Sequence, residues 1–354
     1  MNLPDRFFTH EQVERSRRYH RPLYLAHALD LALALIILGV LAGFARWRIG
    51  PWWLAAPVLA VVAVTISALV RLPLSIWTGY VYERRWGFST QTPRGFAGDF
   101  LRKVLLASFF ALVEVVGVVG LAHAFPSWWP AVAAPLVALF VLVVGFVAPL
   151  VLEPLFNRFA PPADAELAAS LRALAARAGV PVREVLVCDA SRRTTKVNAY
   201  VSGFGKTRRV VLYDTLLGRA ARPELELVLA HELGHRRARH VVKGTVLGMV
   251  GAVIGTLVVW AGVANPRDPA AAPLILLVTL ALEIVGLPFW TALARRWERE
   301  ADRFSLELTH DRDAFVTVHR ELATANLSDL DPPRLVYRLL FTHPTPPERI
   351  ASAG

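Results

Sequence analysis

The sequence holds a single cysteine, Cys188, among its 354 residues. One cysteine excludes a disulfide within the chain and any zinc site built on cysteines. Its apolar neighbours, residues 185–187, predict a buried position on a strand. Charged residues are also few, at 19%, and residues 1–22 lack the apolar core of a signal peptide. Instead, 55% of the residues are hydrophobic and the mean hydropathy is +0.44, which is typical of a polytopic membrane protein rather than a soluble enzyme.

Six apolar runs are long enough to cross a bilayer as helices, which takes about 20 residues. They cover roughly residues 23–44, 52–81, 104–124, 131–152, 241–263 and 272–293. Three ionisable residues, Arg71, Glu114 and Glu283, would lie at membrane depth, where a charge is costly unless it faces water or the protein interior. They indicate either a water-filled chamber among the helices or polar contacts between packed helices.

The formal net charge of +11 could indicate binding to nucleic acid. The basic residues, however, gather in segments that flank the apolar runs, namely the N-terminus, residues 83–103, residues 153–240 and the tail from residue 295. Six spans put these four segments on one side, and the short turns on the other side are nearly uncharged. Positively charged segments stay in the cytoplasm. The sequence therefore predicts cytoplasmic termini, a cytoplasmic polar segment and no nucleic-acid partner.

Residues 153–240 form a long polar segment between the fourth and fifth spans. Its first part, residues 164–178, predicts an amphipathic helix. Runs rich in β-branched residues predict three strands, at residues 183–189, 197–204 and 209–213. An edge strand of such a sheet can pair with an extended peptide.

The clearest chemical signal is the motif His231-Glu232-x-x-His235, within a predicted helix over residues 223–240. Positions i and i+4 share one helical face, so the two histidines can bind one metal ion. Two neutral imidazoles with an open position suit Zn²⁺, which lowers the pKa of bound water to about 7. Glu232 can take the proton of that water as it attacks a carbonyl. The pentapeptide also occurs by chance on ordinary helices.

A zinc ion bound by two histidines needs a third protein ligand. Glu298 and Asp302 follow the last span, lie four residues apart and share a helical face, whereas Glu300 points elsewhere. One carboxylate can bind the metal while the other orients a histidine ring. The alternative is a solvated charged helix with Arg–Glu pairs. Other histidines, His240 and His319 among them, match no motif and are interpreted as structural or exposed.

Several segments, taken in order, resemble the type I CAAX prenyl endopeptidases, a family of integral-membrane zinc metallopeptidases. Residues 86–92 resemble the family's Gly-Phe-Asn-x-Gln-Thr loop, although Ser89 stands where the family favours Asn. The resemblance extends to the family's Pro-Leu-Phe stretch, edge-strand block, zinc helix, third-ligand motif and C-terminal His-Pro signature, at residues 154–157, 198–217, 231–235, 298–302 and 343–350. Eukaryotic members carry seven spans, whereas this chain offers about six, and the missing span corresponds to their first.

This resemblance implies roles for the metal residues. It implies that one Zn²⁺ is held by Glu298 together with His231 and His235, that Glu232 is the catalytic base, and that Asp302 supports a ligand from the second shell of the metal.

The resemblance also implies roles for residues that contact the substrate. It implies that Asn198, together with Ala199 and Tyr200, binds the substrate backbone. It further places His343 and Arg349 near the scissile carbonyl, where they stabilise the oxyanion or the supporting carboxylate.

The predicted fold class is a mainly α polytopic membrane protein with a cytoplasmic zincin-like α+β catalytic part that carries a small sheet. The parts are a four-span membrane domain, a catalytic segment, two further spans and a C-terminal catalytic segment, at residues 1–152, 153–240, 241–294 and 295–354. We expect a monomer in a bacterial inner membrane, with the active site in the cytoplasm. Its partners would be the lipid bilayer and a peptide or membrane-protein substrate, with or without a lipid group.

Two alternative functions remain open. One keeps the chemistry and assigns it to quality control of membrane proteins, as in the bacterial heat-shock membrane metalloprotease. The other is a transporter or channel that uses Arg71, Glu114 and Glu283 and keeps zinc as a structural ion. A structural site would be closed by four ligands. The sequence offers only three good ones, which favours an open catalytic position.

Overall fold

The computed structural model describes residues 2–44, 49–203 and 208–353. Within them, six helices are long and apolar enough to cross a membrane, as predicted. They are α1 (His10–Phe44), α2 (Trp52–Ile76), α4 (Pro93–Ala124), α5 (Trp129–Phe156), α9 (His240–Gly262) and α10 (Ala272–Thr309). The second span continues beyond α2 through the π-helical turn η2 (Trp77–Tyr82) and the short α3 (Glu83–Arg85).

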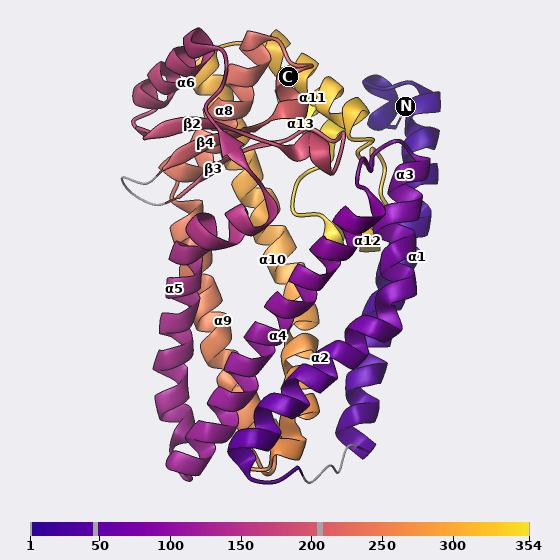
Figure 1. The fold of residues 1–354 in the computed structure, drawn as a ribbon. Coiled ribbons are helices and arrows are strands. Elements are labelled where there is room, and N and C mark those ends of the chain that lie inside the picture. Colours follow the sequence, from indigo (N-terminus) through magenta and orange to yellow (C-terminus); the bar gives the residue numbers. More distant parts are fainter. Residues whose placement is uncertain (1, 45–48, 204–207, 354) are drawn as a thin grey trace.

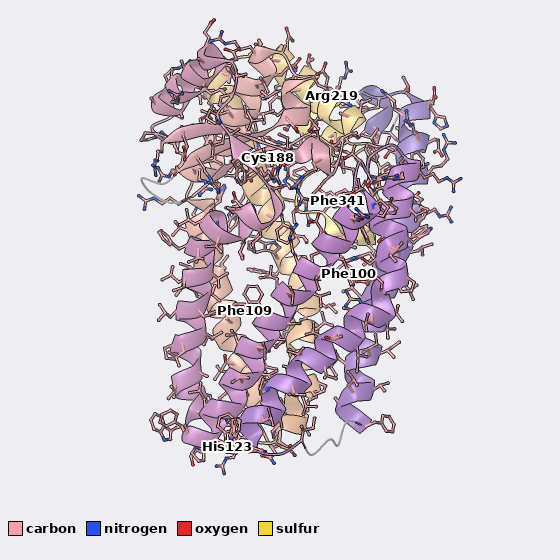
Figure 2. All side chains as sticks on the ribbon, in the orientation of Figure 1. Phe100, Phe109, His123, Cys188, Arg219 and Phe341 are labelled. Atoms are coloured by element: carbon pink, nitrogen blue, oxygen red, sulfur yellow. The ribbon has the colours of Figure 1, made fainter. Side chains whose placement is uncertain are left out.

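The six helices form a bundle with a polar cap at one end, and both termini lie in or beside that cap (Figure 1). In the bundle, α2 packs on α4, α5 packs on α9, and α1 packs on α10. Small residues such as Ala56 and Ala60 on α2 are fully buried and let α4 approach closely. His123 lies at the end of the bundle opposite the cap (Figure 2).

The charged residues at membrane depth surround a cavity of about 690 Å³ between α1, α2, α4 and α10. Arg71 forms an ion pair with Asp30 of α1, with 2.9 Å from Nε to Oδ1. Glu114 accepts a hydrogen bond from Thr279 across the helices. The three residues Arg71, Glu114 and Glu283 thus line one interior space, and two of them also join neighbouring helices.

A four-stranded sheet forms the centre of the cap, in the order β1-β2-β4-β3. Its strands are β1 (Phe159–Ala160), β2 (Glu184–Cys188), β3 (Ala199–Ser202) and β4 (Arg209–Tyr213). The pairs β1–β2 and β3–β4 are antiparallel, and β2–β4 is parallel. The three predicted strands are present, and β1 adds a fourth. Cys188 is buried on β2, as its apolar neighbours predicted (Figure 2).

Helices cover the sheet and build the core of the cap. They are α6 (Ala165–Arg177), α7 (Asp214–Leu217), α8 (Arg222–Arg237), α11 (Arg312–Ala325), α12 (Arg334–Leu340) and α13 (Pro346–Ser352). Short 3₁₀ turns complete the described elements, at η1 (Pro4–Arg6), η3 (Ala190–Arg192) and η5 (Pro269–Ala271). Leu171 of α6, Leu212 of β4, and Leu229 and Leu233 of α8 are buried together, so one apolar core fixes the zinc-motif helix against the sheet.

Helix α10 joins the bundle to the cap. Its 38 residues run without a break past residue 293, the predicted end of the last span, and carry Glu298 and Asp302 into the cap. At about 1.5 Å per residue the helix is roughly 57 Å long. The direction of this membrane span therefore determines where the Glu298 and Asp302 carboxylates lie.

A loop of the membrane domain also holds the segment that leads into β3. Ser89 forms an isolated β-bridge with Thr194, and Thr195 N donates to Phe88 O at 3.0 Å. Asp99 of α4 accepts two hydrogen bonds from the Arg193 guanidinium, at 2.7 and 3.1 Å. The edge strand is thus positioned by the bundle as well as by the sheet.

Candidate metal centre

Helix α8 presents the His-Glu-x-x-His motif to α10. Ala221 N donates to Glu224 Oε2 at 2.7 Å, which closes the first turn, and Pro223 in that turn has no N–H left unpaired. Further along, Gly234 faces Ala301, and a Cβ at position 234 would lie 3.0 Å from the Ala301 Cα. The glycine therefore permits the close crossing of α8 and α10 that brings the candidate ligands together.

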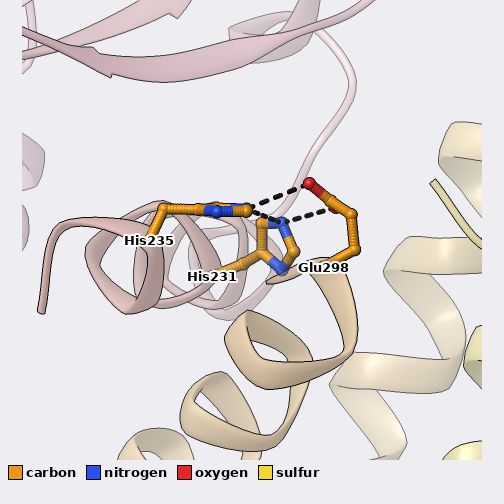
Figure 3. A group of neighbouring side chains, drawn as sticks. All are labelled: His231, His235 and Glu298. Carbon is orange, nitrogen blue, oxygen red and sulfur yellow. Dashed lines mark hydrogen bonds and ion pairs between the residues drawn. The ribbon is translucent and has the colours of Figure 1, made fainter. Parts of the chain in front are cut away.

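The side chains of His231, His235 and Glu298 converge where α8 and α10 cross, and together they are called the metal group (Figure 3). The Nε2 atoms of His231 and His235 are 3.2 Å apart. Glu298 reaches them from α10, with 3.2 Å from Oε2 to His231 Nε2 and 3.1 Å from Oε1 to His235 Nε2. His231 and Glu298 are buried and His235 is half-buried, so His235 is the most accessible of the three.

This donor set fits a tetrahedral zinc ion. Zinc bonds of 2.0–2.1 Å place neighbouring ligand atoms about 3.3 Å apart, close to the 3.2 Å between the two histidine nitrogens. Each carboxylate oxygen of Glu298 lies at a similar distance from one of these nitrogens. Glu298 Oε2 is buried and accepts no hydrogen bond within the described residues. Burial and the Arg349 guanidinium oppose a charge on the His231 ring, but Asp302 and Glu298 outweigh them and raise its pKa to about 9. The site therefore favours a positive charge where the three side chains meet.

Asp302 contacts His231 at the ring nitrogen that faces away from the metal group. Its Oδ1 lies 2.8 Å from His231 Nδ1, on the side of the ring away from the metal group. Arg349 binds the same carboxylate with two nitrogens, and its Nε lies 2.8 Å from Oδ2. Asp302 holds the pKa of Arg349 above its usual value although burial opposes this. Of the two roles expected for Arg349, the structure brings it to the supporting carboxylate.

The C-terminal signature folds into the support of Arg349. Thr345 caps α13, where its backbone N–H donates to Glu348 Oε2 at 2.8 Å, and the Tyr337 hydroxyl donates to the same oxygen at 2.8 Å. Pro346 begins the helix, which a residue without an N–H can do at no cost. These contacts fix α13 and carry Arg349 to Asp302.

His343 lies beside Glu298, and Glu232 directly follows His231 in the chain. His343 Nε2 is 3.4 Å from Glu298 Oε1, and its side chain is 59% exposed. Glu232 is half-buried, follows the first ligand and makes no hydrogen bond or ion pair with the described residues. Both groups are free to meet a substrate or a water molecule.

Strand β3 is one of the two edge strands of the sheet, and one of its sides does not pair with β4. Because Asn198 O accepts from Tyr213 N, the antiparallel alternation turns the backbone groups of Ala199 and Val201 away from β4. Asn198 is exposed, and its Oδ1 accepts from Ala199 N at 2.9 Å. The Ala199 side chain is buried, and the Tyr200 hydroxyl donates to Glu153 at 3.3 Å. The expected edge strand is therefore present, beginning at Ala199, and residue 204 of its predicted range lies outside the described residues.

Arg236 closes one end of that edge. From α8 its guanidinium donates to Gly203 O at 2.9 Å and also to Val201 O. A peptide that pairs with β3 meets this guanidinium where the strand ends. No sequence motif predicts this role for Arg236, because its position depends on the packing of α8 against β3.

Two histidines outside every recognised motif also lie next to the metal group. His319 is buried beside Asp302, donates from Nδ1 to Phe315 O at 2.8 Å, and has a pKa lowered to about 3 by burial and by Arg349. It is structural, as interpreted from the sequence. His240 contacts His235 and reaches Glu300, so the interpretation that left it outside the site was incomplete. Glu300 contacts His240 and is not among the three described residues that could hold a metal ion.

Comparisons with known proteins agree with this geometry. Residues 161–354 match peptidase family M48, and residues 6–158 match the family described as CAAX prenyl protease N-terminal, five membrane helices. In the described part of that second range, four helices qualify as spans. The family model has five membrane helices in this range, so the difference is consistent with the expectation that this chain has one span fewer than eukaryotic members.

Individual relatives include the uncharacterized metalloprotease YhfN of Bacillus subtilis, 32% identical over 302 residues that cover 81% of this chain and 70% of that protein. CAAX prenyl protease 1 of Saccharomyces cerevisiae is 33% identical over 186 residues, 50% of this chain and 40% of that protein. The crystal structure of S. mikatae Ste24p shares the fold, with a TM-score of 0.80 at 22% identity over 97% of this chain and 89% of that one.

Proposed function

The chain belongs to peptidase family M48 and is an integral multi-pass membrane metallopeptidase, and on that premise we propose that it is a zinc-dependent endopeptidase. The observation that carries the proposal is the convergence of His231, His235 and Glu298, whose candidate ligand atoms all lie within 4.8 Å of one another. A structural zinc site would be closed by a fourth protein ligand. Among the described residues, only these three candidate ligands lie close enough together to share an ion, which favours a position kept for water and substrate.

The chain's own residues supply the proton transfers. When bound, the zinc ion supplies Lewis acidity for the scissile carbonyl and for the attacking water. Glu232 takes a proton from that water and returns it to the leaving amine, and its freedom from other partners within the described residues suits this role. Asp302 keeps the proton of His231 on Nδ1, so that Nε2 presents its lone pair to the metal.

Other side chains bind the substrate in this proposal. The peptide pairs with the free edge of β3, in the segment formed by Asn198, Ala199 and Tyr200. His343, exposed and 3.4 Å from Glu298, donates to the oxyanion that forms on the carbonyl. Arg349 acts through Asp302 rather than on the substrate, because both of its contacts to that carboxylate are already made.

We propose a peptide or membrane-protein substrate and a monomeric enzyme in a bacterial membrane. The relatives' names support a CAAX-like peptide, whereas the Arg-rich, Ala-rich composition suggests a GC-rich bacterial genome in which prenylated CAAX proteins are not expected. The distribution of basic residues supports a cytoplasmic active site. A role in membrane-protein quality control uses the same chemistry and differs only in the substrate.

The test follows cleavage of a prenylated CAAX peptide and its unprenylated twin by detergent-purified protein. Zinc-loaded protein, chelated protein and Glu232→Gln are compared side by side. Zinc-dependent cleavage that is lost in Glu232→Gln supports the proposal, and the ratio of rates for the twins measures the contribution of the lipid. Cleavage that survives in Glu232→Gln contradicts the assigned base.

A further inference from the structure

His240 connects a histidine of the metal group to a carboxylate outside that group. Its Nδ1 lies 3.0 Å from Nδ1 of His235, and its Nε2 lies 3.2 Å from Oε2 of Glu300. The His240 side chain is 3% exposed, and that of Glu300 is 53% exposed. A row of three side chains therefore leads from the metal group to the protein surface.

The positions of the ring protons follow from the bond that each nitrogen makes. When Nε2 of His235 binds a metal ion with its lone pair, the proton of the neutral ring is on Nδ1. Nδ1 donates to Nδ1 of His240, which must then be unprotonated and carry its own proton on Nε2. That second proton is donated to Glu300. Each proton has one acceptor, and both hydrogen bonds lead away from the metal group.

Two features hold the His240 ring in this place. It stacks on Trp297 of α10, with 4.8 Å between ring centroids and 11° between the planes. The preceding residue, Arg239, has φ +58°, a left-handed conformation that residues with a side chain rarely adopt. This turn lets α9 begin directly at His240 and brings its ring back onto His235. Unfavourable backbone conformations of this kind persist where the surrounding contacts require them.

We infer that His240 is a positioning residue for the metal ligand His235, with Glu300 as its anchor. A ligand histidine whose second nitrogen donates to a fixed acceptor keeps one tautomer and one ring orientation and becomes more basic. Asp302 does this directly for His231, at 2.8 Å. For His235 an imidazole takes the place of the carboxylate, and the carboxylate lies one residue further out. The inference rests on the proposed metal site and does not depend on which substrate the enzyme cleaves.

Metal affinity tests this role without any peptide. Full-length protein in detergent is stripped of metal and titrated with Zn²⁺ against a chromophoric chelator. His240→Phe keeps a ring to stack on Trp297 but removes the acceptor, and we expect Zn²⁺ to bind about 10- to 100-fold more weakly. His240→Asn offers an amide oxygen close to the place of Nδ1 and is expected to recover most of that loss. The absorption bands of bound Co²⁺ should shift in His240→Phe and return towards the wild-type spectrum in His240→Asn.

The matched control is His123, which also stacks on a tryptophan, Trp52, at 4.9 Å and 17°. Its Nε2 lies 2.9 Å from Arg267 O, at the end of the bundle opposite the cap (Figure 2). His123→Phe should keep wild-type affinity for Zn²⁺. Wild-type affinity in His240→Phe, or an equal loss in His123→Phe, overturns the inference and leaves the proposed peptidase intact.

Glu300→Ala provides a second variant that avoids a buried substitution. Its side chain is half exposed, so the protein should fold, and removal of the anchor is expected to weaken Zn²⁺ binding several-fold. Unchanged affinity in Glu300→Ala overturns the part of the inference that concerns the anchor. A wild-type protein that binds no Zn²⁺ overturns the inference and the proposed function together.

Discussion

Gly234 of α8 lies directly against Ala301 of α10, at the crossing that forms the metal group. A Cβ at position 234 would lie 3.0 Å from Ala301 Cα and 3.2 Å from Ala301 O. Both are backbone atoms within a 38-residue helix, so neither can move away by rotation of a side chain. The separation of the two helices, and with it the distance from Glu298 to the histidines, depends on a residue without a side chain.

Gly234→Ala should therefore destabilise the protein and weaken metal binding together. The added methyl group pushes α8 from α10, at a cost of about 1–3 kcal/mol for overpacking. The measurements are the melting temperature in detergent and the affinity for Zn²⁺. Gly251→Ala in α9 is the control, because a Cβ there meets no atom within 4 Å. Wild-type affinity for Zn²⁺ in Gly234→Ala would contradict the proposed role of the crossing.

Removal of the metal is expected to lower the melting temperature of the wild-type protein. Zn²⁺ binds the folded state, and a free concentration of about 100 times its Kd would add about 2.7 kcal/mol of stability. Glu298→Gln should lose most of this response because the amide is a poor substitute for the carboxylate ligand. Glu307→Gln, an exposed carboxylate on the same helix, should keep it. An equal response in both variants would remove Glu298 from the ligand set.

Much of the site was predictable because its signals are local. His231 and His235, and likewise Glu298 and Asp302, are four residues apart, and the helical repeat alone places each pair on one face. The six spans follow from the length and composition of the apolar runs. β1 was missed because it is two residues long and exists only through its pairing with β2.

His240 was missed because the end of α8 leaves no mark in the sequence. A continuous helix over residues 223–240 would place positions 235 and 240 about 140° apart around its axis. The structure instead ends α8 at Arg237 and turns at Arg239, where neither glycine nor proline indicates a break. Likewise, Arg236 reaches β3 only because α8 packs against that strand, which no local pattern predicts.

Cys188 should be unreactive in the folded protein. Burial, followed by the nearby Asp189 and Asp214 carboxylates, raises the pKa of its thiol from 9.0 to about 11. At pH 8 a shift of this size lowers the thiolate fraction about 100-fold relative to the unfolded chain. Maleimide should label the protein only after denaturation. Rapid labelling of the folded enzyme would contradict the position of β2 in the sheet.

Arg349→Leu should destabilise the cap and weaken Zn²⁺ binding. Asp302 is 2% exposed, and without the guanidinium its charge is left buried with His231 as its remaining close partner. Loss of one partner of a buried ion pair costs about 3–5 kcal/mol. The melting temperature measures this loss, and Arg349→Lys should restore only part of it because a lysine lacks the planar fork. Full recovery with lysine would contradict the two-point contact.

Arg236 is expected to limit how far a peptide can extend along β3. Its contacts to Val201 O and Gly203 O occupy carbonyl groups with which an added strand could pair. In the wild-type enzyme, lengthening a cleavable peptide past this point should leave kcat/KM unchanged. In Arg236→Ala the edge is free, and each extra backbone hydrogen bond, at about 1 kcal/mol, should raise kcat/KM for the longer peptide roughly fivefold. Arg237→Ala is the matched control, because Arg237 donates to Ala178 O at 3.1 Å and does not touch the edge. If both variants respond equally to peptide length, Arg236 does not limit the length of substrate that pairs with β3.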